Sequence, residues 1–546
     1  MSGYSAGLLG FRSTEIDDSR VAAALAVSPW RGRPTSSHVT GVGQVYALGE
    51  ASSAQEDGVS IVLHGRIDRL PNADADIPTG NSGHDTCLAL IEAYRRDGAE
   101  FVDRLTGDFA IILVDERDGS MLATRDWLGT RPLFWGRTER GLAFASEVQQ
   151  VLALLDAPYR LDEDTLETHA RMDDPPVDAT FALGVKAVVP GGLVVARASG
   201  YAETRRFRVR FPPVALPRAS ADETVRQRLE LAVGRRTRGA LHLGGLVSGG
   251  MDSTAVMATA ASLAARGAGP PPVAALTFAY RDDPQSDETA LASAVAARWG
   301  IPWHLVETPP GDFATWPDVG FDRHLGPTAT GFATMRHMSE TARRAGVDVL
   351  LSGELGDYWL IQTGSELRLS ILRGDLRGIV AWGLAGARAN PRRTAGQLYR
   401  GLQGRLRGDR AEAYFERHVD SWIRWNLEMK EREAMFHGIR IEFPFADRDL
   451  VTLLAGVPPS RRSSPGTDKL ITRRAMRGLL PMSVLERTGY SIIDPWLNAA
   501  MGPRSGGDTS LPLAAATRRY ADAWRSRSAD SVEEHVTTEF TTNGGS

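Results

Sequence analysis

The sequence predicts two domains, a β-rich α+β domain followed by an α/β domain built on a parallel sheet. Two observations support this prediction. The first 207 residues read mainly as short strands and turns, whereas strands and helices alternate after residue 220. Such alternation favours a parallel sheet wrapped by helices. The segment 208–220 between them carries three prolines and few periodic features, which is typical of a domain junction.

In the first domain, runs of β-forming residues bounded by Gly, Asp and Pro predict strands at 59–68, 109–116 and 120–126. A helix is expected at 85–98, where Leu88, Ile91 and Tyr94 recur at helical spacing. We therefore expect the first domain to cover residues 1–207.

In the second domain, the expected strands are 240–247, 272–280, 302–307 and 347–353. Helices are expected at 252–266, 287–300 and 336–346. This domain is predicted to cover residues 220–501. Residues 502–546 are rich in Ser, Thr, Gly and Arg, and we expect them to form a loosely ordered tail.

The Arg- and Trp-rich segment 365–435 has a mostly helical pattern. Its arginines and aromatic side chains suit contact with a peptide, among them Arg392, Arg393, Tyr399, Trp422 and Trp425. A packed helix face with solvated charges is the more common origin of such a pattern, and we prefer that interpretation.

Composition excludes several classes of function. The chain of 546 residues has a net charge of −4, which gives no reason to expect a nucleic-acid partner. The N-terminus lacks the features of a signal peptide, and the longest apolar runs are too short to cross a membrane. A single cysteine, Cys87, leaves no internal disulfide. We expect a cytoplasmic protein that binds neither nucleic acid nor membrane.

The stretch "LVSGGMDS" predicts a phosphate-binding loop at the end of a strand. Gly249 and Gly250 permit close backbone approach, and the amides with the following helix N-terminus suit an anion. Its predicted nucleotide-binding residues are Leu246, Val247, Ser248, Gly249, Gly250, Asp252 and Ser253. A carboxylate beside polyphosphate is repulsive unless a divalent cation lies between them, so Asp252 implies Mg²⁺. The alternative is a glycine turn with Asp252 as a helix cap.

A second loop, "LLSGELGDYW" (351–359), ends another strand in the same manner. Ser352 and Gly353 are expected to contact the nucleotide, and Asp357 to share the metal with Asp252. The ends of neighbouring parallel strands meet at one edge of a sheet, where ligands bind.

These motifs resemble those of a known family. "LVSGGMDS" is similar to the signature of the PP-loop ATP pyrophosphatases, and the second loop resembles the "SGEGxDE" loop of the asparagine synthetase B family. "SDETALA" and the blocks 439–458 and 468–487 resemble further family elements, and 105–135 resembles its amidotransferase domain.

The resemblance implies an N-terminal Ntn-hydrolase-like αββα sandwich of the class II glutamine amidotransferase type. It also implies a C-terminal PP-loop domain, like the adenine-nucleotide α-hydrolases, that cleaves ATP to AMP and pyrophosphate.

The N-terminal half departs from the family pattern. The family's nucleophilic cysteine follows Met1, but this chain has Ser2, a poorer nucleophile at neutral pH. His64 and Arg66 replace residues of the family's "NGE" glutamine pocket, although Gly107 and Asp108 persist. We expect this domain to keep its fold without making ammonia.

Two residues receive catalytic roles from the resemblance. Glu354 stands where asparagine synthetases have glutamate and is expected to accept a proton from the attacking amine. Lys469 is expected to stabilise charge near the α-phosphate. An exposed loop glutamate and a salt bridge are the respective alternatives. A second family lysine has no counterpart in "RTGY" (487–490), and Arg487 either replaces it or forms an ion pair.

Without ammonia, an amine of the substrate itself must attack the activated carboxyl. The preferred function is that of a lasso peptide cyclase, which uses ATP and Mg²⁺ to join a core peptide's N-terminal amine to an Asp or Glu side chain. Its expected partners are the ribosomal precursor peptide, a leader peptidase and a leader-recognition protein. A β-lactam synthetase, an ammonia-dependent asparagine synthetase and a non-catalytic scaffold are the alternatives.

Overall fold

The computed structural model describes most of the chain up to residue 487. The described residues are 4–12, 18–78, 80–138, 141–171, 173–197, 202–206, 211, 221–279, 287–307, 329–360, 365–416 and 421–487. Ser2, nearly all of the expected junction 208–220 and the expected tail 502–546 therefore lie outside the described residues.

The N-terminal domain contains two six-stranded antiparallel sheets. The first has the order β10-β8-β9-β1-β3-β2, with bounds Val185–Ala187, Phe134–Thr138, Gly141–Ala145, Ala6–Arg12, Gln44–Gly49 and Pro34–Val39. The second has the order β12-β11-β7-β6-β5-β4, with bounds Ala202–Arg206, Gly192–Ala196, Ser120–Arg125, Thr106–Asp115, Val59–Arg69 and Ser52–Glu56.

Helices cover the outer faces of both sheets, and apolar side chains fill the space between them. Helices α1 (Asp18–Ala26) and α3 (Val148–Leu155) lie on the first sheet, and α2 (Gly83–Asp97) lies on the second. Leu8, Val62 and Phe144 belong to the cluster between the sheets. Strand β6 is buried along its whole length because both of its faces are covered. The predicted αββα sandwich is thus confirmed. A short helix, α4 (Glu163–Ala170), follows.

The C-terminal domain is built on a five-stranded parallel sheet with the order β15-β14-β13-β16-β17. The strands span Trp303–Glu307, Pro272–Ala279, Leu243–Leu246, Val349–Leu351 and Arg440–Glu442. The four expected strands are present, and the sequence did not predict β17, which has only three residues. The chain leaves β13 for β14 on one side and reaches β16 on the other, so the strand order reverses at β13. Ligands bind at such a switch point in open α/β sheets.

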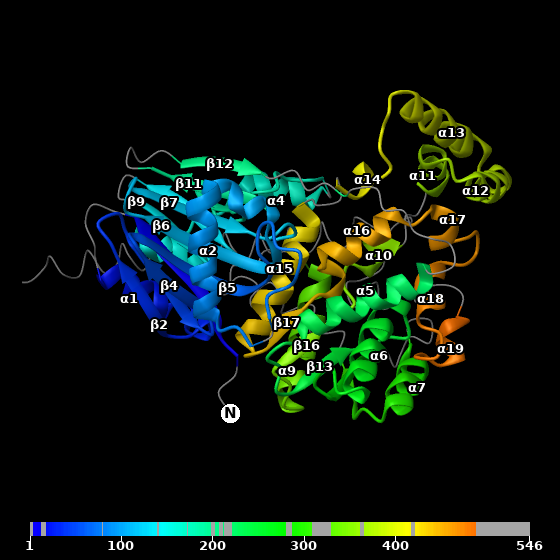
Figure 1. Cartoon of the computed structure of the whole chain (residues 1–546), viewed down its shortest axis with the longest axis horizontal. Helices are drawn as coiled ribbons and strands as arrows, with labels where there is room; N and C mark the ends of the chain where they lie inside the picture. The colour runs from blue at the N-terminus through cyan, green and yellow to red at the C-terminus, as the bar shows by residue number, and fades with distance from the viewer. Residues whose placement is uncertain are drawn as a thin grey trace, which may run out of the picture.

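Several helices of this domain pack around the sheet (Figure 1). The first four are α5 (Ala221–Arg236), α6 (Met251–Ala265), α7 (Thr289–Trp299) and α9 (Ala329–Arg344). The later helices are α10 (Gly356–Leu360), α11 (Glu366–Arg373), α12 (Leu376–Ala389), α13 (Pro391–Leu406), α14 (Ala413–Glu416), α15 (Ser421–Phe436), α16 (Arg448–Gly456), α17 (Pro459–Arg462), α18 (Leu470–Ala475) and α19 (Met482–Leu485). The expected helical character of 365–435 is confirmed where the structure describes it.

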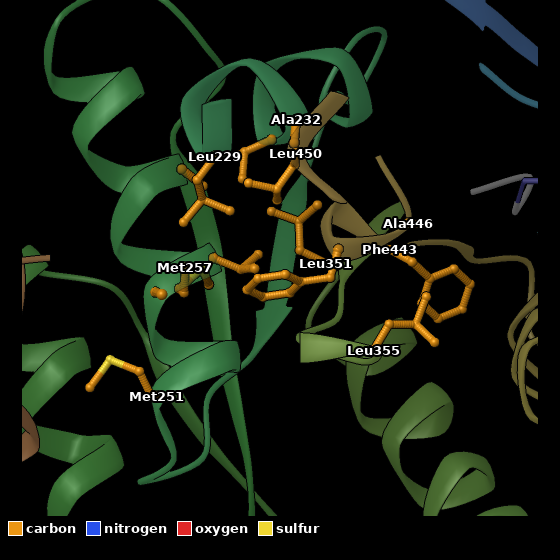
Figure 2. Close-up of a cluster of buried hydrophobic side chains, with 14 of the residues drawn as sticks. Leu229, Ala232, Met251, Met257, Leu351, Leu355, Phe443, Ala446 and Leu450 are labelled. Atoms are coloured by element: carbon orange, nitrogen blue, oxygen red, sulfur yellow. The ribbon is translucent and has the colours of Figure 1, made fainter. Parts of the chain in front are cut away.

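An apolar core lies directly beneath the ends of β13 and β16. Figure 2 shows Leu229 of α5, Met257 of α6 and Leu351 of β16 with Phe443 and Leu450 in this cluster. Each of these five side chains is almost fully buried. Burial of each side chain contributes roughly 1.5–3 kcal/mol to folding, so the core fixes the two strand ends relative to each other.

Helix α15 joins the two domains. Arg31 donates to both carboxylate oxygens of Glu431 at 2.9 Å, and Arg125 donates to Glu428 at 2.6 Å. Arg432 of the same helix pairs with Glu147 at 2.6 Å. All six side chains are buried. No helix in the part of the chain that the structure describes is both long and apolar enough to span a membrane.

Candidate functional site

The first glycine loop connects β13 to α6. The Ser248 backbone N–H donates to Ser253 Oγ (2.9 Å), and the Gly250 N–H donates to Ser248 Oγ (3.0 Å). Helix α6 begins directly after Gly250, so its unpaired N–H groups open onto the loop. At Gly249, a Cβ would lie only 2.9 Å from a methyl carbon of Leu291. The loop therefore depends on glycine for its close contact with α7.

The second glycine loop packs directly against the first. It leads from β16 to α10, and β16 pairs with β13 in parallel. A Cβ at Gly353 would lie 2.3 Å from the Ser253 backbone nitrogen, and a Cβ at Gly356 would lie 2.3 Å from Asp252 Cγ. A side chain at Gly353 would therefore require the backbone to move, and one at Gly356 would displace the Asp252 side chain. Two glycines thus allow the two loops to meet.

Lys469 connects the carboxylates of the two loops. Its Nζ lies 2.5 Å from Asp252 Oδ2 and 2.6 Å from Asp357 Oδ1. The side chain is buried, and its residue has a positive φ of 50° at the start of α18. Although burial opposes a charge on the ammonium, the two aspartates raise the pKa of Lys469 above its usual value. The sequence predicted these three residues at the site, and the salt bridge that it offered as the alternative role of Lys469 is present, with Asp252 and Asp357 as the partners.

The carboxylates fit a divalent cation. Burial raises the pKa of Asp252 to about 7, Lys469 opposes the shift, and the charge of Asp357 adds to it. Asp252 Oδ1 is buried and has no hydrogen-bond partner among the described residues. The Asp357 side chain is 68% exposed and faces solvent.

The described residues contain no cluster of three or more His, Cys, Asp or Glu side chains arranged to hold a metal. Mg²⁺ commonly binds one or two carboxylates together with substrate phosphates and water. Asp252 and Asp357 supply such a pair, and Asp252 Oδ1 is the oxygen left without a partner.

A cavity of about 400 Å³ opens over both loops. All twelve predicted site residues line it: Leu246, Val247, Ser248, Gly249, Gly250, Asp252, Ser253, Ser352, Gly353, Glu354, Asp357 and Lys469. Its volume falls within the range of small-molecule sites, roughly 300–1,000 Å³. Sequence reasoning missed Thr277 and Phe278 of β14, which line it as well. The position of β14 beside β13 brings them there.

Arg487 contributes through Glu288. Its guanidinium lies 2.5 Å from Glu288 Oε1, and Glu288 Oε2 accepts a hydrogen bond from the Gly249 N–H at 3.0 Å. Glu288 belongs to the "SDETALA" motif, and both side chains line the cavity. The ion pair that we expected as one alternative for Arg487 is present. Through Glu288 it stabilises the position of the first glycine loop.

Glu354 is held by two side chains of α15. Asn426 Nδ2 donates to Oε1 at 2.8 Å, and Lys430 donates to Oε2. Burial raises the pKa of Glu354, but the Lys430 ammonium and the Asn426 hydrogen bond outweigh burial and hold the pKa below its ordinary value. The carboxylate is therefore ionised at neutral pH. Sequence reasoning missed Asn426 and Lys430, although Lys430 is one of only three lysines in the sequence and could have been singled out for that reason.

Comparisons with known proteins match both parts of the chain to family models. A family model described as asparagine synthase matches residues 224–495, and one described as glutamine amidotransferase domain matches residues 72–208. The chain belongs to the asparagine synthetase family. Members of this family are ATP-dependent carbon–nitrogen ligases, and the chain is an enzyme of this class.

Individual relatives are distant. An asparagine synthetase [glutamine-hydrolyzing] 1 of Bacillus subtilis is 23% identical, with 83% of this chain and 79% of that protein covered. A putative asparagine synthetase of Mycobacterium bovis is 25% identical over 75% of this chain and 71% of that protein. Amidase chyE of Penicillium rubens is 26% identical, but the match spans only 50% of this chain and 42% of that amidase.

Among solved structures, a glutamine phosphoribosylpyrophosphate amidotransferase of B. subtilis is 14% identical. The similarity covers 55% of this chain and 65% of that one, with a TM-score of 0.25.

The residues whose motif resembles the family's glutamine-pocket pattern take part in ion pairs in this structure. Asp108, which the sequence retains from the family pattern, accepts from Arg66 at 2.8 Å and from Arg236 at 2.9 Å. His64 is fully buried, and its burial lowers its pKa well below the usual value. Burial raises the pKa of the Cys87 thiol to about 12, so this thiol is not a nucleophile at neutral pH.

Proposed function

We propose that this enzyme is a lasso peptide cyclase. It activates the side-chain carboxyl of an Asp or Glu in a core peptide with ATP, and it joins that carboxyl to the peptide's N-terminal amine. The convergence of Asp252 and Asp357 on Lys469 between two glycine loops is the observation that supports adenylation. The reaction is expected to take place in the cytoplasm, where ATP is available.

In the first step, a carboxylate oxygen of the substrate attacks the α-phosphorus of ATP, and the bond to the β-phosphate bridge breaks. Pyrophosphate leaves toward the N-terminus of α6, whose first N–H groups favour an anion. Mg²⁺, when bound, offsets the repulsion between the phosphates and the aspartates. Lys469 places a second positive charge beside the same carboxylates.

In the second step, the amine nitrogen attacks the acyl carbon, and the bond to the AMP oxygen breaks. The nitrogen must lose a proton during this step, and Glu354 lines the same cavity with an ionised carboxylate. Lys430 and Asn426 fix the direction of that carboxylate. The products are an amide, AMP and pyrophosphate.

The amine is proposed to come from the substrate itself. Serine follows Met1 where the family's glutaminase domains have a nucleophilic cysteine. In addition, two arginines already neutralise Asp108. Both features argue against hydrolysis of glutamine in the N-terminal domain, and they support intramolecular attack. The precursor peptide, a leader peptidase and a leader-recognition protein are the partners that this function requires.

An ammonia-dependent asparagine synthetase is the second candidate. It is favoured by the relatives named asparagine synthetases, which cover most of this chain, and by Glu354 in the second loop. A β-lactam synthetase remains a further alternative, although we expect tyrosine at the Glu354 position in that group.

One experiment separates these functions. The enzyme is incubated with ATP, Mg²⁺ and each candidate substrate: precursor peptides encoded near the gene, after leader removal, or aspartate with ammonium. Release of AMP and pyrophosphate together with a product lighter than the peptide by one water supports the cyclase. Formation of asparagine supports the second candidate. Release of ADP and phosphate contradicts adenylation altogether.

A further inference from the structure

The hairpin formed by α12 and α13 has an unusual exposed surface. Leu376, Val380 and Leu384 recur every four residues on α12, and Leu398, Leu402 and Leu406 do so on α13. This spacing places each set on one side of its helix. All six are exposed, up to 88% for Leu406. Large exposed apolar patches on soluble proteins mark interaction sites. The packed face that we expected from the sequence therefore leaves these six apolar side chains uncovered.

The same hairpin is strongly basic. Between Asp375 and Asp409 the sequence contains no acidic residue. Six exposed arginines of the hairpin region have no ion-pair partner within the described ranges: Arg377, Arg388, Arg392, Arg393, Arg400 and Arg407. By contrast, the arginines that join the two domains are buried and paired. The hairpin therefore combines apolar side chains with uncompensated positive charge.

A cavity links this hairpin to the nucleotide site. It has a volume of about 530 Å³ and lies between α11, α12, α13 and the loop 463–468. Leu367, Trp382, Ala385 and Ala389 give it a largely apolar wall. Asp468, the residue before Lys469, lines both this cavity and the nucleotide cavity. A ligand in the second cavity is thus adjacent to the loop that carries Lys469.

We propose that the α12–α13 hairpin docks an acidic, apolar segment of the substrate polypeptide, with one apolar side chain in the second cavity. This proposal rests on the proposed function, since it assumes a polypeptide substrate. Charge complementarity selects an acidic partner, and the exposed leucines select an apolar one. In Figure 1 the hairpin stands at one edge of the molecule, beyond α17 and far from α1 and α2, where a long chain has room to bind.

Other occupants fit less well. A second copy of the hairpin would bring its own arginines against these, and like charges repel. An anionic bilayer would match the charge and the leucines, but it would make no use of a cavity next to the nucleotide site. Asp468 lines both cavities, so a ligand in the second cavity lies next to the proposed reaction centre. This position favours a segment of the substrate over a bilayer or a second copy.

The test measures binding of a fluorescein-labelled helical peptide made of Glu and Leu at helical spacing, without ATP. Two triple variants remove either charge (Arg392→Ser, Arg393→Ser, Arg400→Ser) or apolar contact (Leu398→Ser, Leu402→Ser, Leu406→Ser). All six side chains are exposed, so neither variant disturbs a core. Each triple variant is expected to weaken binding about tenfold or more. The charge variant is also expected to lose the salt dependence of binding.

The matched control replaces two exposed arginines of the N-terminal domain, Arg33→Ser and Arg160→Ser, and should bind as the wild type does. A peptide with Lys in place of Glu should not bind. Equal binding of both peptides, or equal binding by all variants, overturns the proposal.

Three other occupants have their own readouts, and each would overturn it: hairpin-dependent binding to phosphatidylglycerol vesicles in place of the peptide, a hairpin-dependent dimer in sedimentation, or a cross-link from the hairpin to residues 488–546. Because ATP is absent, failure of adenylation leaves these measurements unaffected. An Asp252→Asn variant should bind the peptide normally, which separates the failure of docking from the failure of the proposed function.

Discussion

Arg31 and Glu431, 400 positions apart in the sequence, form a bidentate ion pair in which both N···O distances are 2.9 Å. This pair joins the N-terminal sandwich to helix α15. The same helix carries Asn426 and Lys430, which hold Glu354 at the nucleotide cavity. The N-terminal domain therefore supports the candidate base through one helix. This relationship gives the N-terminal domain a structural role at the cavity.

Loss of Arg31 should destabilise the protein. Arg31→Met leaves Glu431 buried with part of its charge uncompensated, and we expect a loss of about 3–5 kcal/mol in the free energy of unfolding. Chemical denaturation measures the change. Arg171→Met, which removes an exposed pair with Glu167, serves as the control and should change stability by less than about 1 kcal/mol. Similar losses in both variants would contradict the role given to the buried pair.

Removal of either loop carboxylate should abolish adenylation. Asp252→Asn and Asp357→Asn each weaken the proposed hold on the metal, and we expect pyrophosphate release to fall at least about 100-fold. A coupled assay for pyrophosphate checks this, with Asp74→Asn as an exposed control that leaves the rate unchanged. Normal turnover in the double variant would refute the proposed site.

Lys469 should be required for catalysis and not only for the stability of the fold. Lys469→Met leaves Asp252 and Asp357 without their shared cation, and we expect a loss of at least about 100-fold in kcat. Lys469→Arg keeps the charge but not the compact ammonium, and it should restore only part of the rate. Lys186→Met, at an exposed lysine, is the matched control. Full activity of Lys469→Met would show that the lysine serves structure only.

The acid side of the pH–rate profile should report Glu354. Burial raises the pKa of this carboxylate and Lys430 lowers it, so Lys430→Met should move the acid limb of kcat upward by about one pH unit or more. Glu354→Gln should remove the limb together with most of the amide-forming rate. Lys186→Met should leave the profile in place. An unchanged limb in Lys430→Met would mean that another group limits the reaction in acid.

His169 should make the protein sensitive to acid. The ring packs against Phe181, Trp422 and Trp425, and burial lowers its pKa to about 4. The unfolded chain binds this proton below about pH 6.5, whereas the folded protein does not until about pH 4. Stability should therefore fall as the pH drops through this window, by about 3 kcal/mol for this group.

His169→Phe should remove that part of the pH dependence in denaturation curves recorded between pH 7 and pH 4. His242→Phe, at an exposed histidine, should not. If both variants keep the wild-type slope, the acid sensitivity has another origin.

The sequence by itself determined the family, the fold class and twelve residues that line one cavity. It could do so because both glycine loops end strands, and the ends of neighbouring parallel strands must meet. The functional residues of each loop lie within a few consecutive positions, so Asp252 and Asp357 could be found from local sequence motifs alone.

Tertiary structure alone decided which side chains face these residues. Lys430 and Asn426 lie more than seventy positions from Glu354, on a helix whose place is set by buried ion pairs with the other domain. The exposure of the apolar side chains on α12 and α13 could not be predicted either. Leucines at every fourth position occur both on helix faces that are buried and on helix faces that are exposed. Local pattern fixes which residues share a face, and only the packing of distant elements decides what covers it.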